Sequence, residues 1–159
     1  MCWQCDNPDL GIEDYFDEVR ETIRTQGWMV QYVESDRTPF AYTIGLHDWG
    51  FPELSITAVS PQRATRLLNT VARDAVAGKN LTPGQQIKVP AGPLIEIVEM
   101  SHPDAHLNFA VAFGGAEIRA LQLVWADGRG RWPWSAAFCD GRRQQPVLGI
   151  RSRVTRANR

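Results

Sequence analysis

The stretch that decides the fold is RTPFAYTIGLHDWGFPEL, residues 37–54. It reads as a hydrophobic strand, a turn rich in glycine and aromatic residues, and a second strand that begins with Pro-Glu-Leu. Two glycines of this stretch are surrounded by side chains with polar groups, namely Tyr42, Thr43, His47, Trp49 and Glu53. The stretch therefore predicts a pair of strands and, between them, a surface that can carry a function.

Upstream of this stretch, the spacing of apolar residues predicts an amphipathic helix over residues 12–26. Its apolar positions follow the i, i+3, i+4, i+7 pattern and its acids are concentrated in the first turns. Gly27 is a typical C-terminal cap. The segment WMVQYV, residues 28–33, then predicts a strand that forms an antiparallel hairpin with residues 40–46.

Downstream, residues 53–59 predict a third strand, and a long helix follows it. Ser60 and Pro61 stand in the order preferred at a helix start, with serine as the N-cap and proline in the first helical position. The apolar positions of this helix continue to Val76, and Gly78 ends it. This helix is the second of two main helices.

The rest of the chain predicts shorter elements. A short strand is expected at residues 86–89, an alternating strand at 94–100, a short helix at 105–113 and a buried strand at 118–126. We therefore expect an α+β fold: a single compact domain over residues 1–150, with a mostly antiparallel sheet, two main helices and one short helix. Residues 151–159 are expected to form a basic, flexible tail.

Composition narrows the class of protein. A chain of 159 residues that is 43% hydrophobic and 22% charged can bury a core without disulfides. It contains no apolar run near the roughly 20 residues that a membrane span needs. The first ten residues lack the pattern of a secretory signal, so we expect a cytoplasmic protein without a membrane.

Charge is distributed unevenly along the chain. Seven acids lie within the first 21 residues, whereas six arginines follow the last acid, Asp140. Such an Arg-rich end can contact a protein or ribonucleoprotein partner; alternatively, it is a solvated tail that the acidic first helix partly neutralises. Because the whole chain carries a net charge of −1, direct sequence-specific DNA binding is not expected.

Five phrases of the sequence resemble a known family. They are FAYTIGL at residues 40–46, PEL at 52–54, LLN at 67–69, LQLVWAD at 121–127 and GRWPW at 130–134. Together they resemble the uncharacterised bacterial family named domain of unknown function 4262, and the C-x-x-C start at Cys2 and Cys5 resembles its actinobacterial branch. The resemblance implies a compact single domain. It supplies no established activity, so no catalytic residues are carried over.

One constellation predicts a metal site. Cys2 and Cys5 form a C-x-x-C pair, which is half of a structural zinc site, because two thiolates in one tight turn occupy adjacent tetrahedral corners. His102 and His106 are four residues apart and share one side of a helix if a helix begins there. Zinc held by these four residues is the resulting prediction, with Cys139 or His47 as a possible replacement for one histidine. The alternatives are a free thiol pair with surface histidines, and redox chemistry at the pair.

A second constellation predicts a pocket. Aromatic walls with a few convergent polar groups are typical of small-molecule sites. His47 and Glu53 could form an oriented general base, since a carboxylate fixes the imidazole tautomer. The alternative is a tryptophan-rich core in which Glu53 satisfies backbone donors at a strand end. The candidate pocket residues are Tyr42, His47, Glu53, Gln122, Trp125, Trp132 and Trp134.

The function expected from these patterns is that of a non-enzymatic accessory or regulatory protein. Its zinc-type site would support or switch binding to a macromolecular partner, in stress or ribosome-associated regulation. The alternatives are a small hydrolase-like enzyme or a small-molecule-binding domain that uses residues 37–54 and the Trp-Pro-Trp segment. No nucleophile elbow, phosphate loop, dinucleotide fingerprint or HExxH motif occurs in the sequence.

Overall fold

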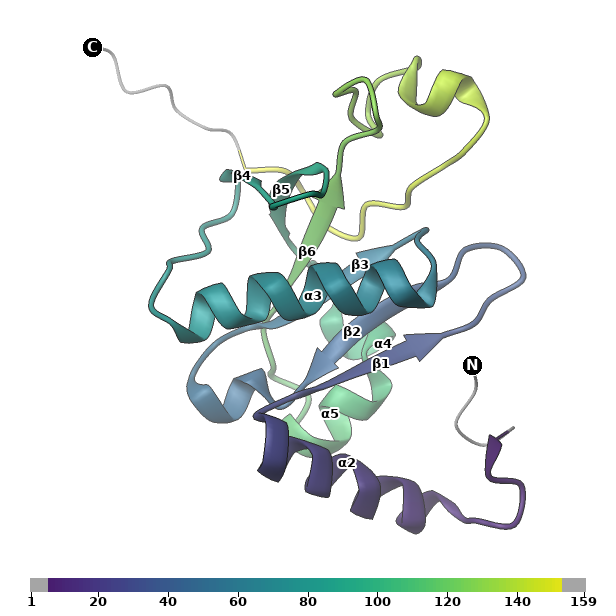
Figure 1. Ribbon diagram of the computed structural model, residues 1–159, viewed down its shortest axis with the longest axis vertical. Helices are drawn as coiled ribbons and strands as arrows, with labels where there is room; N and C mark the ends of the chain where they lie inside the picture. Colours follow the sequence, from purple (N-terminus) through teal and green to yellow (C-terminus); the bar gives the residue numbers. More distant parts are fainter. Residues whose placement is uncertain (1–5, 153–159) are drawn as a thin grey trace.

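A six-stranded mixed sheet organises the protein, as a computed structural model that describes residues 6–152 shows (Figure 1). The order of strands across the sheet is β1-β2-β3-β6-β5-β4. Neighbouring strands run antiparallel except β3 and β6, which run parallel. The predicted α+β fold with a mostly antiparallel sheet is confirmed. The strands are β1 (Met29–Val33), β2 (Phe40–Ile44), β3 (Glu53–Thr57), β4 (Gln86–Lys88), β5 (Leu94–Glu99) and β6 (Ala120–Trp125).

The helices lie close to their predicted places. The two main helices are α2 (Ile12–Gln26) and α3 (Pro61–Val76), and two 3-10 turns are η1 (Leu46–Trp49) and η2 (Phe138–Gly141). The short helix predicted at residues 105–113 is instead two pieces, α4 (Pro103–His106) and α5 (Asn108–Gly114). The break falls at Leu107, whose backbone has φ −101° and ψ 58°, outside the helical region. No helix within residues 6–152 is both long and apolar enough to cross a membrane.

Helix α3 covers one face of the sheet (Figure 1). Its N-terminus is fixed as the sequence predicts, because the Oγ of Ser60 accepts the Arg63 N–H at 3.3 Å and Pro61 begins the helix. The helix packs on β1, β2 and β3. Its buried face joins alternate strand residues in one apolar core that includes Leu54, Ile56, Leu67, Leu68, Ile97, Leu123 and Trp125.

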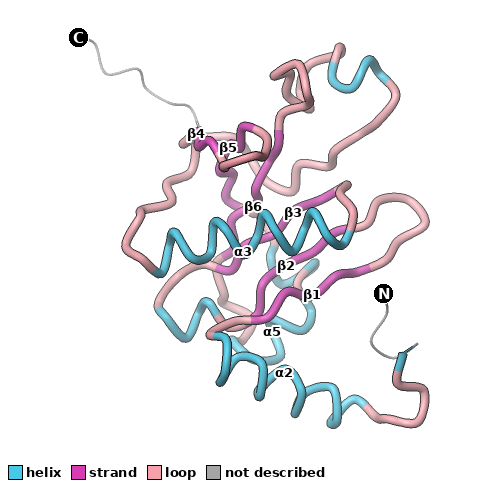
Figure 2. The backbone as a smooth tube through the Cα atoms, in the orientation of Figure 1, coloured by secondary structure: helices cyan, strands magenta, loops and turns pink. Residues whose placement is uncertain are grey.

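Helices α2 and α5 cover part of the opposite face. In Figure 2, α5 lies behind the strands and α2 lies below β1; α2 packs on β1 and α5 packs on β2. The amphipathic stripe of α2 buries Tyr15 and Val19. Aromatic rings of α2 and α5 meet there, with the Tyr15 and Phe109 ring centroids 4.8 Å apart. Because both faces are covered, the central strands β3 and β6 are buried along their whole length.

The remaining part of that face is covered by residues 145–149, which we call the C-terminal strap. The amide of Gln145 accepts the Trp125 N–H at 3.0 Å and donates to the Trp125 carbonyl at 2.8 Å, so it replaces a strand neighbour of β6. Pro146 presents its carbonyl to Gln122 and Thr57. At the far end, Gly149 forms a β-bridge with Met100. The strap therefore satisfies a row of buried polar groups that the helices leave uncovered.

The close approach of the strap to β5 predicts that Gly149→Ala destabilises the protein. A Cβ at residue 149 would lie 1.9 Å from the carbonyl oxygen of Glu99. We expect the free energy of unfolding to fall by about 1–3 kcal/mol in urea titrations, since backbone must move to relieve the overlap. Gly128→Ala is the matched control, because a Cβ there meets no described atom within 4 Å. Equal stability of the two variants would show that the strap does not bind the sheet as described.

Candidate functional site

The first polar centre lies where β2 ends and β3 begins. Glu53 is fully buried at the start of β3. Its carboxylate accepts hydrogen bonds from the Thr43 hydroxyl at 2.6 Å and from the backbone N–H groups of Gly45 and His47 at 3.0 and 2.9 Å. The chain can turn around this carboxylate because Gly45 adopts φ +115°, which strains any other residue. Consequently β2 stops at Ile44, two residues before the predicted end of that strand.

His47 links this centre to α5. Its Nδ1 lies 3.0 Å from Oε1 of Glu53, and its Nε2 lies 3.3 Å from Oδ1 of Asp48. The hydrogen bond with Glu53 raises the pKa of His47, against the opposing effect of burial; the backbone of Phe113 adds a further hydrogen bond. A Cβ at Gly114 would lie 3.1 Å from the His47 ring, so the ring is packed against the end of α5.

This arrangement is that of a structural clamp. The Glu53 oxygens accept from Thr43, Gly45 and His47 and have no exposed surface through which a substrate could reach them. Tyr42 is 1% exposed, and its oxygen accepts the N–H of Phe109 at 3.1 Å. Burial raises the pKa of Tyr42 to about 12. These contacts match the alternative in which Glu53 satisfies backbone donors at a strand end.

The other predicted pocket residues lie elsewhere. Gln122 is buried beneath the strap, and Trp125 is buried in the core under α3, where its Nε1 donates to the Thr57 carbonyl at 2.9 Å. Because β3 and β6 are parallel with Glu53 opposite Ala120, the loop after Trp125 leaves the sheet at the end remote from Glu53. The structure therefore brings His47, Glu53 and Thr43 together and separates them from the tryptophans.

Trp132 and Trp134 belong to the loop after β6, which Asp127 holds in shape. Asp127 accepts the backbone N–H groups of Arg129, Arg131 and Cys139, each at 2.9 Å. Although desolvation acts in the opposite direction, these hydrogen bonds lower the pKa of Asp127 to about 2. Cys139, Asp140 and Gly141 then adopt three consecutive positive φ angles, of 49°, 55° and 73°. That reversal returns the chain toward the sheet.

The two indoles form a stacked pair. Their ring centroids are 5.3 Å apart and their planes differ by 9°. The guanidinium of Arg151 lies 3.6 Å from the ring centroid of Trp134 and donates to both oxygens of Glu96, at 2.8 and 3.0 Å. Arg151, the first residue of the predicted tail, is thus bound to β5 by a bidentate ion pair.

The predicted zinc ligands lie partly outside the described residues. Cys2 and Cys5 belong to the segment that precedes residue 6, so their contacts are not described. His102 precedes α4 as its N-cap and is exposed, whereas His106 ends α4 and is half-buried. Cys139 is half-buried against the core under α3. Within residues 6–152, no group of three or more His, Cys, Asp or Glu side chains is placed to hold a metal ion.

Among the residues that the structure describes, three of the open cavities lie around the N-terminal half of α3 and the loop after β6. The first, of about 520 Å³, is lined by Arg63, Arg66 and glycines of two loops. The second, also about 520 Å³, lies beneath the Trp-Pro-Trp loop and includes Arg143. The third, about 410 Å³, includes Arg37, Arg142 and Arg143. We name these the helix cavity, the loop cavity and the hairpin cavity, and we name their five arginines the arginine face.

Trp125 contacts one arginine of the helix cavity and one that the loop and hairpin cavities share. The guanidinium groups of Arg63 and Arg143 lie 5.6 and 5.7 Å from its ring centroid, which is cation–π distance. Arg143 also donates from Nη2 to the Ala58 carbonyl at 2.9 Å. The buried Nε of Arg63 has no hydrogen-bond partner among the described residues. Sequence reasoning missed this face because its arginines come from three separate segments; the only signal was the Arg142-Arg143 pair in the basic end.

The clamp predicts a pH dependence of stability that depends on His47. Because folding raises the pKa of His47, its contribution to stability is complete below the ordinary histidine pKa of about 6.5 and is lost as pH rises through the raised value. His47→Gln should therefore lower the free energy of unfolding most at low pH and progressively less as pH rises through the raised pKa of His47. Urea titrations of both proteins at several pH values measure this difference. A His47→Gln penalty that is constant with pH would contradict the clamp.

Comparison with known proteins places the chain in a family. The family described as Domain of unknown function (DUF4262) matches residues 22–139. These residues include the clamp, α3, the whole sheet and the Trp-Pro-Trp loop. No curated protein and no solved structure matches the chain. The chain belongs to the DUF4262 family.

Proposed function

We propose that this chain is a non-enzymatic accessory protein of the cytoplasm that binds an anionic macromolecular partner through the arginine face. The supporting observation is that five arginines from three segments line three cavities, two of which share Arg143 and Gln144. Among the described residues that line them, Asp127 is the one carboxylate, and its oxygens already accept hydrogen bonds within its own loop. The cavities are thus rich in donors and poor in acceptors, which favours an anion.

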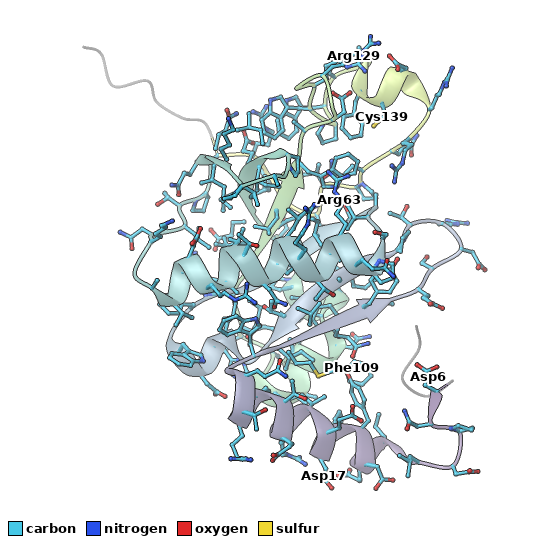
Figure 3. The ribbon with its side chains drawn as sticks, viewed as in Figure 1. Asp6, Asp17, Arg63, Phe109, Arg129 and Cys139 are labelled. Carbon is cyan, nitrogen blue, oxygen red and sulfur yellow. The ribbon has the colours of Figure 1, made fainter. Side chains whose placement is uncertain are left out.

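The distribution of charge supports the same proposal. The acids of the first 21 residues are carried mainly by α2, and Figure 3 shows Asp17 of that helix at the opposite end of the molecule from Arg129. A net charge of −1 therefore conceals two ends of opposite sign. Such separation orients an approaching anionic partner toward the basic end and away from the acidic one.

The clamp supports a role without catalysis. A general base must reach the proton that it removes, whereas Glu53 is fully buried and His47 is bonded at both ring nitrogens. The alternative enzyme would combine residues 37–54 with the Trp-Pro-Trp segment. The parallel register of β3 and β6 places Glu53, with its partner His47, at the end of the sheet remote from the Trp-Pro-Trp segment, so this pair and the tryptophans offer no common site for a substrate.

Removing charge from the arginine face should weaken its binding to anions. We expect the double variant Arg37→Gln/Arg142→Gln to elute from a heparin column at lower salt than the wild type. The variant has two fewer guanidinium groups, so its binding displaces fewer counterions from heparin. Arg73→Gln is the control. Arg73 is an exposed arginine near the C-terminal end of α3, and it does not belong to the arginine face. Equal elution of all three proteins would rule out the arginine face as the binding surface.

We propose separately that Cys2, Cys5, His102 and His106 hold one zinc ion, which would order the start of the chain. The support is that His102 and His106 bracket α4 and keep solvent access. Thiolates and neutral imidazoles are the ligands that structural zinc prefers. Metal bound there would couple the first residues to α4 and so provide the regulatory element of the proposed function.

Elemental analysis tests the zinc proposal directly. Protein purified without chelator should contain about one zinc ion per chain, and Cys2→Ser/Cys5→Ser should contain none. Cys139→Ser is the control and should keep the metal, because Cys139 packs against the core under α3. Wild-type protein without stoichiometric metal would reject this site while leaving the arginine face untouched.

A further inference from the structure

The hairpin cavity has the composition of a phosphate site. Arginines of two segments line it, with Arg37 on the β1–β2 connection and Arg142 and Arg143 on the segment after η2. The Thr38 hydroxyl, the Ser60 hydroxyl and the Gln144 amide also line it. None of the described residues that line the cavity is a carboxylate. These donors come from three separate segments and surround an open volume of about 410 Å³.

This arrangement suits a tetrahedral anion better than a planar one. A carboxylate is planar and is satisfied by one bidentate arginine, as Glu96 is by Arg151 in this protein. A phosphate group presents oxygens in several directions and can accept from donors on different segments at once. Arg143 is already held at Ala58 and over Trp125, so one guanidinium of the site is fixed before a ligand arrives.

The loop cavity continues this surface. It shares Arg143 and Gln144 with the hairpin cavity and is bordered by Pro133 and Ser135, the neighbours of Trp134. Trp134 is 39% exposed although it is stacked with Trp132 and Arg151. An exposed, rigid aromatic stack therefore lies next to the arginine-lined cavities. Aromatic stacks beside basic grooves are the usual means by which proteins bind single strands without sequence preference.

Resting on the proposed function, we propose that the anionic partner is single-stranded nucleic acid. Its phosphates lie in the hairpin and loop cavities, and a base contacts the Trp132–Trp134 stack. A single phosphorylated side chain would use one cavity and would leave the stack without a role. A strand carries repeating phosphates and flat bases, and so matches both features. Discrimination between sequences is not expected, since these are backbone and stacking contacts.

Fluorescence anisotropy of the full chain with a fluorescein-labelled oligouridylate tests the proposal. Arg37→Gln/Arg142→Gln should weaken binding about tenfold and make the slope of log affinity against log salt shallower by about 1.4, because each of two lost phosphate contacts contributes about 0.7 on a single strand. Trp134→Leu should weaken binding about fivefold or more through lost stacking, with little change in the salt slope. Arg73→Gln is the control and should bind as the wild type does. Circular dichroism of each variant separates loss of binding from loss of fold.

Competition experiments decide between kinds of anion. Polyglutamate of equal charge is added as a competitor. If the labelled oligouridylate stays bound, the arginine face recognises phosphate and not negative charge alone. Displacement by polyglutamate, or preference for a phosphoserine peptide, would overturn the nucleic-acid inference while the arginine face remains the docking surface. Failure of every anionic probe to bind, together with unchanged heparin elution of the arginine variants, would reject the proposed function as well. An unaffected Trp134→Leu variant would contradict the stacking contact.

Discussion

The buried carboxylate of Glu53 is the interaction on which the rest of the structure depends. A carboxylate removed from water must be supplied with donors, or it costs several kcal/mol. Here the donors come from the end of β2 and from η1, so the β2–β3 connection can close in one way. Through His47 the same group reaches the end of α5. Strands β2 and β3 and a helix from a later part of the chain are thereby fixed to one another.

The opposite end of the sheet is built differently. There most of the buried polar groups are neutral amides and hydroxyls that the C-terminal strap satisfies, and the buried carboxylate of Glu96 is paired with Arg151. The carboxylates of Asp127 and Glu96 are bound to arginines there, and further arginines line open cavities or cover the Trp125 ring. One end of the sheet is therefore sealed around a negative charge, and the other presents positive charge to solvent. The proposed binding surface lies at the end that is open.

Sequence patterns predicted most of the fold, because helices and strands leave periodic signals. The strand after residue 40 was predicted two residues too long, because the pattern cannot show that Gly45 turns back over Glu53. His47 and Glu53 were predicted as partners, and they are. Their separation from the tryptophans depends on the parallel pairing of β3 with β6, which one sequence does not encode locally. For the same reason the arginine face, assembled from three segments, was not predicted.

The strap lies after every strand of the sheet in the sequence. All strands of the sheet precede residue 126, whereas the groups that satisfy Gln122, Thr57 and the Trp125 backbone begin at Gln145. The chain is synthesised from its N-terminus, so the strands are made before the strap that supplies these partners. Arg151 follows the strap and contacts Trp134, so the proposed binding surface depends on the last of the described residues.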